Sequence, residues 1–190
     1  MPAATIKPRL PLSPPQKWTK PTLENTHGGK TYQPTHPGLF VVEFTAEKGL
    51  EEGYTSRLAA ARDFEPNECI TLLTNISLAP EKAYSSVQFV NHSCSPSVEV
   101  RFSLHPEKWA IYARSKGVKR GETLTFFYPS TEWDTAQGFN CACGSTDCLD
   151  KIQGAKYISL QDLEKRSYIN RHILVLKEAQ QSSKPLLDGP

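Results

Sequence analysis

Hydrophobic and polar residues follow a strand-like pattern through the middle of the chain. The stretch 98–104 reads VEVRFSL and alternates apolar with polar positions, which is the two-residue period of a strand with one buried face. The other candidates are short and rich in β-branched and aromatic residues. These patterns predict five short strands, at 38–44, 69–74, 98–104, 109–114 and 124–128. The strands at 98–104 and 109–114 flank His105-Pro106 and are expected to form a hairpin.

The pattern changes after Ser159. Leu160 and Leu163 lie three positions apart, and the apolar positions of 173–176 follow Asn170. Asparagine is a common N-cap residue, so Asn170 is expected to cap a second helix. The fold class predicted is therefore mainly β, with little helix except near the C-terminus.

Proline content separates the first part of the chain from the rest. Eight of the 15 prolines precede residue 38, and the residues among them show no regular periodicity. We expect a proline-rich arm at 1–35, a β domain at 36–130, a cysteine-bearing segment at 131–156, and a helical segment with a frayed tail at 157–190.

Composition then narrows the class of protein. The chain has 190 residues, a hydrophobic fraction of 38% and a net charge of +2. It contains no run of roughly 18 apolar residues and no apolar N-terminal stretch of a secretory signal, so we expect no membrane span and a cytoplasmic or nuclear location. The small net charge predicts no direct nucleic-acid binding, and the basic stretch at 114–120 is interpreted as a solvated connection.

Cysteines supply the first candidate chemistry. Three of them lie close together in FNCACGSTDCLD: Cys141, Cys143 and Cys148. Clustered thiols in a reducing compartment bind zinc more often than they form disulfides, and the alternative is a set of buried, inert thiols. The candidates for a fourth ligand are Cys94, Cys69 and His92. Cys94 is favoured because its neighbours are polar and turn-forming, whereas Cys69 begins an apolar strand and is expected in the core.

Three segments in this order resemble a known family. VQFVNHSCSPS, GETLTFFY and CACGSTDC are similar to the two signature segments and the post-SET zinc motif of SET-domain protein methyltransferases. The resemblance implies a SET-type β-clip of several short sheets with a pseudoknot, and a small zinc site. It also implies S-adenosylmethionine as cofactor, zinc as metal, and a protein lysine, such as a histone lysine, as methyl acceptor.

The resemblance also implies residue roles. Tyr128 matches the catalytic tyrosine, and a phenol suits methyl transfer because an in-line displacement mainly needs alignment and electrostatic stabilisation. Asn91 and His92 match the pair that binds the cofactor, and Phe126 matches a substrate-channel position. Further cofactor contacts are expected from four residues: Phe89, Arg57, Leu58 and Leu149.

Some positions differ from the family pattern. Thr55-Ser56-Arg57 stands where relatives carry Gly-x-Gly, the interval between Ile70 and Asn91 is short, and Phe127 replaces the usual Asp. Two other functions therefore stay open beside a lysine methyltransferase. One is a non-catalytic zinc scaffold with this fold, and the other is an enzyme of this fold that acts on a small molecule.

Overall fold

The computed structural model describes residues 36–44, 56–73 and 89–182, so the predicted arm at 1–35 and the tail from 183 lie outside the described residues. The strands are β1 (Phe40–Phe44), β2 (Ser56–Ala60), β3 (Cys69–Leu72), β4 (Asn91–His92), β5 (Val98–Arg101), β6 (Ala110–Ala113), β7 (Thr125–Phe126), β8 (Phe139–Asn140) and β9 (Lys151–Ile152). The helical elements are η3 (Pro106–Lys108), η4 (Tyr128–Ser130), η5 (Ala155–Tyr157), α1 (Leu160–Arg166) and α2 (Arg171–Ser182).

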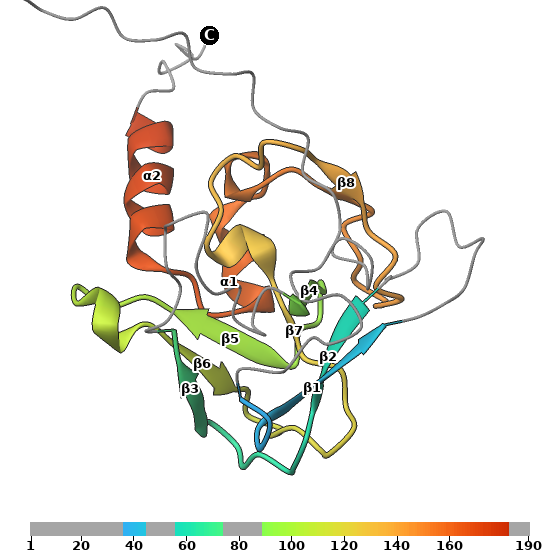
Figure 1. Ribbon diagram of the computed structural model, residues 1–190. Coiled ribbons are helices and arrows are strands. Elements are labelled where there is room, and N and C mark those ends of the chain that lie inside the picture. The colour runs from blue at the N-terminus through green and yellow to red at the C-terminus, as the bar shows by residue number, and fades with distance from the viewer. Residues whose placement is uncertain (1–35, 45–55, 74–88, 183–190) are drawn as a thin grey trace, which may run out of the picture.

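The described strands form small separate sheets rather than one large sheet. β1 pairs with β2, β3–β6–β5 form an antiparallel sheet, β8 pairs with β9, and β4 pairs with β7 in parallel. In Figure 1 the helices lie on one side of the molecule, the β1–β2 and β3–β6–β5 sheets lie on the other, and β4 and β7 lie between them. This arrangement confirms the mainly β fold of several short sheets with two C-terminal helices.

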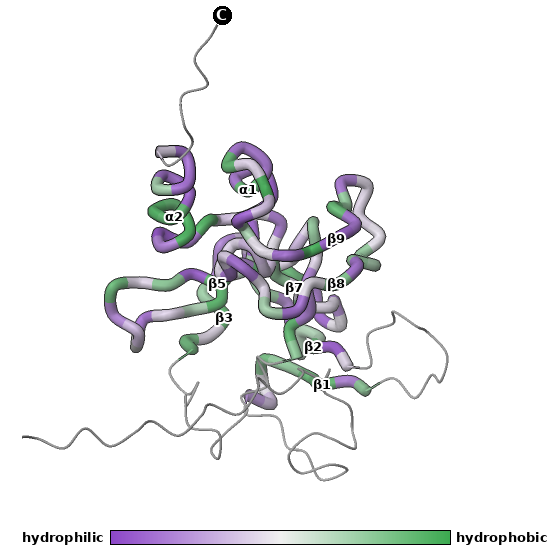
Figure 2. The backbone as a smooth tube through the Cα atoms, turned by 90° about the horizontal axis from the view of Figure 1, so that it is seen from above, coloured by the Kyte–Doolittle hydropathy of each residue, from purple (hydrophilic) through white to green (hydrophobic). Residues whose placement is uncertain are grey.

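Two apolar clusters hold these parts together. The first fills the space among the β1–β2 and β3–β6–β5 sheets, and its largest members include Phe40, Leu58, Phe89 and Ile111. The second joins the end of β7 to the C-terminal helices: Phe127, Ala155, Leu163, Ile169 and Ile173. Figure 2 shows hydrophobic residues along β1 and mixed colours along both helices, as expected for helices with one buried face.

Local sequence explains several boundaries. In β5, Val98 and Val100 are buried and the polar residue between them is half-buried, which is the alternation predicted for this strand. Ser159 caps α1, because its side-chain oxygen accepts a hydrogen bond from the Asp162 N–H. Pro106 opens η3, where its missing N–H costs nothing.

The predicted strand ends were too long. β1 begins at Phe40, after a turn at residues 37–39, and β5 ends at Arg101. The stretch predicted as strand 124–128 contains only the two-residue β7, and Tyr128 already begins η4. The strand β2 was not predicted.

Two residue expectations were wrong. Cys69 is exposed rather than in the core, because it stands at an outward-facing position of β3. Asn170 precedes α2 as expected, but its side chain does not cap the helix: Nδ2 donates to the carbonyl oxygens of Val100 (2.9 Å) and Ser130 (3.0 Å), and Oδ1 accepts from the Phe102 N–H (2.7 Å). Asn170 is fully buried and ties α2 to β5 and η4.

Gly154 provides a test of how the 131–156 segment packs. It has φ +110°, and a Cβ placed on it would stand 2.5 Å from the Trp133 carbonyl oxygen and 2.8 Å from its carbon. We expect Gly154→Ala to lower the free energy of unfolding by about 3 kcal/mol or more, from backbone strain and overlap together. Urea unfolding followed by Trp fluorescence measures this loss.

Gly121 is the matched control for this substitution. It also has a positive φ, +82°, but a Cβ added to it would meet no heavy atom within 4 Å. Gly121→Ala therefore carries the conformational strain without the overlap and should cost only about 1–2 kcal/mol. Equal losses for the two variants would show that the close approach of Gly154 to Trp133 does not contribute.

Candidate functional site

The centre of the candidate site is the parallel pair formed by β4 and β7. Asn91 lies opposite Thr125 and His92 lies opposite Phe126. The Ser93 N–H extends the pairing by donating to the Phe126 carbonyl oxygen at 3.1 Å. Asn91 and His92 are both buried. The structure thus brings together the NHSC and TFFY segments, which belong to two of the three segments that carry the family resemblance.

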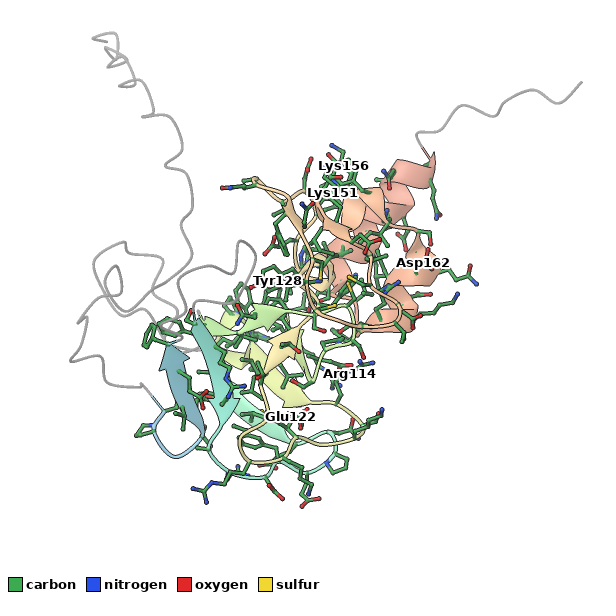
Figure 3. All side chains as sticks on the ribbon, turned by 90° about the vertical axis from the view of Figure 1, so that its right-hand side faces the viewer. Arg114, Glu122, Tyr128, Lys151, Lys156 and Asp162 are labelled. Atoms are coloured by element: carbon green, nitrogen blue, oxygen red, sulfur yellow. The ribbon has the colours of Figure 1, made fainter. Side chains whose placement is uncertain are left out.

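Tyr128 is held at both its backbone and its phenol group. Its N–H donates to His92 Nδ1 at 3.2 Å, and its hydroxyl donates to the Val90 carbonyl oxygen at 3.0 Å. Its ring packs at 4.6 Å from that of Phe126, measured between centroids. Tyr128 is half-buried and lies between the sheets and the helices (Figure 3). The phenol oxygen is therefore oriented, with its hydrogen directed at a backbone carbonyl.

His92 connects Tyr128 to the cysteines. A backbone N–H can only donate, so Nδ1, which receives the Tyr128 N–H, is the unprotonated nitrogen. The proton then lies on Nε2, which is 3.4 Å from Cys94 Sγ and donates to it. Burial, and secondarily the positive charge of Arg166, lowers the pKa of His92 to about 4. The ring is therefore neutral near pH 7 and keeps this single tautomer.

Cys94 joins the three clustered cysteines in space. The sulfur atoms of Cys94, Cys141, Cys143 and Cys148 all lie within 4.8 Å of one another. The Sγ atoms of Cys94 and Cys141 are 3.9 Å apart, and those of Cys143 and Cys148 are 3.7 Å apart. Zinc–sulfur bonds of about 2.3 Å in a tetrahedron require sulfur separations of about 3.8 Å, whereas a disulfide requires about 2.05 Å. The four side chains fit a tetrahedral zinc ion.

Backbone N–H groups near these sulfurs favour the negatively charged thiolate form. The Leu149 N–H donates to Cys94 Sγ and the Asp150 N–H donates to Cys148 Sγ, each at 3.4 Å. Burial raises the pKa of Cys94 to about 11, and the negative charges of Cys143 and Cys148 add to this rise. Burial also opposes ionisation of Cys143, but hydrogen bonds from neighbouring backbone and thiol groups lower its pKa to about 7. Four thiols so close together ionise jointly only with a cation among them.

The remaining predicted cofactor residues have partners within the fold. Asn91 Nδ2 donates to the Ser56 carbonyl oxygen at 2.8 Å, so this side chain ties β4 to β2. Arg57 pairs with Glu43 at 2.6 Å and donates to Thr123 Oγ1 at 2.9 Å. Leu58 is fully buried in the first apolar cluster. Their contacts with a cofactor stay predictions.

Phe89 and Leu149 also pack inside the protein. The Phe89 ring meets that of Phe44 edge to face at 5.5 Å, and Leu149 packs against the second apolar cluster. The short interval before Asn91 falls mostly on residues 74–88, which lie outside the described residues.

Two aromatic residues near Tyr128 have roles that the sequence reading missed. Phe139, on β8, packs against the rings of His92 and Tyr128 with centroid distances of 5.6 and 6.0 Å. The sequence did contain a signal for this position of Phe139. Phe139 lies two residues before Cys141, and the metal motif brings Cys141 close to Cys94. Phe127, where the family commonly has Asp, is fully buried in the second apolar cluster. An apolar residue is needed there because the C-terminal helices cover it.

Comparison with known proteins agrees with this architecture. Small sheets around a parallel pair of signature segments, beside a four-cysteine cluster, define a SET-type protein, and the family model for the SET domain matches residues 33–129. The chain belongs to the SET domain family of methyltransferases.

Three relatives show the range of the family. The methyltransferase flvH of Aspergillus flavus is 35% identical over 158 residues, which cover 74% of this chain and 82% of that protein. The histone-lysine N-methyltransferase ash1 of Drosophila melanogaster is 25% identical over 70% of this chain, but over only 6% of its own length. The histone-lysine N-methyltransferase met-2 of Caenorhabditis elegans is 32% identical over 34% of this chain and 5% of its own.

Proposed function

We propose that this protein is an S-adenosylmethionine-dependent methyltransferase that transfers a methyl group to a lysine amine of a protein substrate, such as a histone. The observation that carries the proposal is the chain of contacts from Cys94 through His92 to Tyr128, on the paired strands β4 and β7. Family membership and the histone-lysine methyltransferases among the relatives support the reaction and the acceptor.

Tyr128 provides the chemistry that this reaction needs from the protein. S-adenosylmethionine, when bound, supplies an electrophilic methyl group on a sulfonium. Tyr128 donates its phenol hydrogen to the Val90 carbonyl, so we expect its oxygen lone pairs to face the partly positive methyl and the incoming amine. Phe126, against the Tyr128 ring, would form an apolar wall that favours an unprotonated lysine. Asn91 and His92 would hold the cofactor, together with the sequence-assigned residues Phe89, Arg57, Leu58 and Leu149.

A zinc ion belongs to the same proposal. Cys94, Cys141, Cys143 and Cys148 would hold it, because their sulfur separations fit a tetrahedral site. The ion would supply structure rather than catalysis, since four protein ligands leave no open position. Its effect on the active site would pass through Cys94, the one ligand on the NHSC segment.

A second acceptor class has one observation in its favour. The relative that matches over most of both chains is named a methyltransferase, whereas the relatives named histone-lysine methyltransferases are much longer proteins than the region they share. The name of that relative gives no protein acceptor, so we keep a small-molecule amine as the alternative acceptor. We propose a cytoplasmic or nuclear location, with nuclear following from a histone substrate. None of the helices in the described part of the chain has the length and apolar character needed to span a bilayer.

Cofactor binding tests the proposal before any acceptor is known. Titration calorimetry with S-adenosylmethionine and S-adenosylhomocysteine should show saturable binding at or below about millimolar concentration, and each should raise the melting temperature. Absence of heat and of a thermal shift for both compounds would overturn the enzyme and leave a SET-fold zinc scaffold.

The acceptor is tested next with methyl-labelled cofactor. We expect label on lysine residues of recombinant histones, located by mass spectrometry. Free lysine and small aliphatic amines serve as parallel acceptors. Label on these and not on protein would replace the protein substrate by a small molecule while leaving the cofactor and Tyr128 assignments in place.

A further inference from the structure

A polar cavity is lined both by one cysteine of the four-cysteine cluster and by residues of helix α1. Its volume is about 330 Å³, and Cys94 forms part of its wall. Figure 3 labels two other lining residues, Arg114 after β6 and Asp162 on α1. The remaining lining residues are Ser95, Asp147, Lys165 and Arg166. The cavity therefore places charged groups from α1 beside a sulfur ligand of the proposed metal site.

Most charged groups around this cavity already have partners within the fold. Arg114 interacts with Glu99 at 3.5 Å and donates to the Pro96 carbonyl oxygen at 3.3 Å. The Asp162 carboxylate accepts from the Ser159 hydroxyl at 2.6 Å. Lys165 is exposed, so its ammonium group is open to water. These residues do not need the cysteine cluster to be satisfied.

Arg166 differs from them in two ways. Its Nη1 donates to the carbonyl oxygen of Asp147, the residue directly before Cys148. Its Nε is buried and has no hydrogen-bond partner among the described residues. A buried donor without a partner on a charged group costs folding free energy. A negatively charged group that forms when the metal binds would offset this cost. Arg166 thus fastens α1 to the metal-binding loop and retains an unused donor.

The charge of the metal site supplies such a group. One Zn²⁺ bound by four thiolates carries a net charge of −2, and this excess lies in a partly buried region where water screens it poorly. An arginine keeps its positive charge at every accessible pH and is more weakly hydrated than a lysine. An arginine can therefore form part of the wall of this cavity, which Cys94 also lines, at a low desolvation cost.

We propose that Arg166 is the counter-charge and positioning residue of the four-cysteine metal site. This inference rests on the zinc site proposed above. Arg166 offsets part of the negative charge of the metal-bound cysteines and, through the Asp147 carbonyl, holds the loop that carries Cys148. Outer partners of this kind are worth about 10- to 100-fold in metal affinity.

Zinc affinity of three variants tests the proposal. The dissociation constant is measured by competition with a chromogenic zinc chelator, and cobalt absorption reports thiolate coordination independently of any enzymatic activity. Arg166→Met should weaken zinc binding by about 10- to 100-fold. Lys165→Met removes the same charge from the same cavity and should change the affinity by less than about twofold, because exposed charges interact weakly. Arg166→Lys, which keeps the charge, should recover most of the loss.

The outcomes separate the two proposals. Wild-type protein without zinc affinity would overturn the metal site itself. Wild-type affinity in Arg166→Met would overturn the role of Arg166 alone, and so would equal losses in the Arg166→Met and Lys165→Met variants. If Arg166→Met does not fold, Arg166→Gln takes its place: a loss of tenfold or more in the folded protein supports the counter-charge, and a smaller change excludes it. Far-UV circular dichroism of the zinc-saturated proteins establishes folding.

Discussion

Tyr128→Phe is expected to reduce methyl transfer by at least about 100-fold while cofactor affinity changes little. The phenol oxygen is the group that the fold orients, through the bond from the hydroxyl to the Val90 carbonyl and the bond from the backbone to His92. Removing one preorganised polar group that stabilises developing charge commonly costs about 10²- to 10³-fold in rate. The ring packing against Phe126 and Phe139 is unchanged by the substitution, so the pocket keeps its shape.

The measurement is single-turnover methyl transfer together with calorimetric cofactor binding. Loss of the Val90 hydrogen bond should lower the free energy of unfolding by only about 1 kcal/mol, so the variant remains folded. Tyr157→Phe is the matched control, because the Tyr157 hydroxyl donates to Asp134 at 3.2 Å on the exposed side of the 131–156 segment. Full activity in Tyr128→Phe would contradict the catalytic assignment, and loss in both variants would indicate a general structural effect.

The sequence predicted those structural features that depend on residues close together in the chain. The hairpin of β5 and β6 follows from neighbouring residues, and it was predicted with ends that were too long. The two-residue strands β4, β8 and β9 have no periodicity of their own and exist because they pair with other segments of the chain. A search for alternation along the chain has no signal for them.

The sequence likewise predicted some parts of the candidate site and missed others. Cys94 was recognised as a partner of the cysteine cluster because its polar turn sequence distinguished it from Cys69. The link from Cys94 through His92 to the Tyr128 backbone required coordinates, since it depends on a tautomer that only the Tyr128 N–H defines. Asn170 was misread because its buried hydrogen bonds are made with residues far away in sequence.

Cys94→Ser is the second substitution with a large expected effect, and it acts on two sites at once. Losing a sulfur ligand should weaken zinc binding by more than about 100-fold, beyond the loss typical of an outer partner. His92 and the Leu149 N–H both donate to Cys94 Sγ, so the same change disturbs the contacts that hold Tyr128 and the loop after Cys148. We therefore expect cofactor affinity to fall together with zinc content.

The comparison that decides this is between Cys94→Ser and Cys69→Ser, with zinc measured by elemental analysis and cofactor binding by calorimetry. Cys69 is exposed on β3 and is not a member of the four-cysteine group, so its substitution should leave both quantities unchanged. A Cys94→Ser protein that keeps zinc as tightly as wild type would remove Cys94 from the ligand set. Loss of zinc with unchanged cofactor affinity would instead show that the metal stabilises the 131–156 segment without acting on the active site through His92.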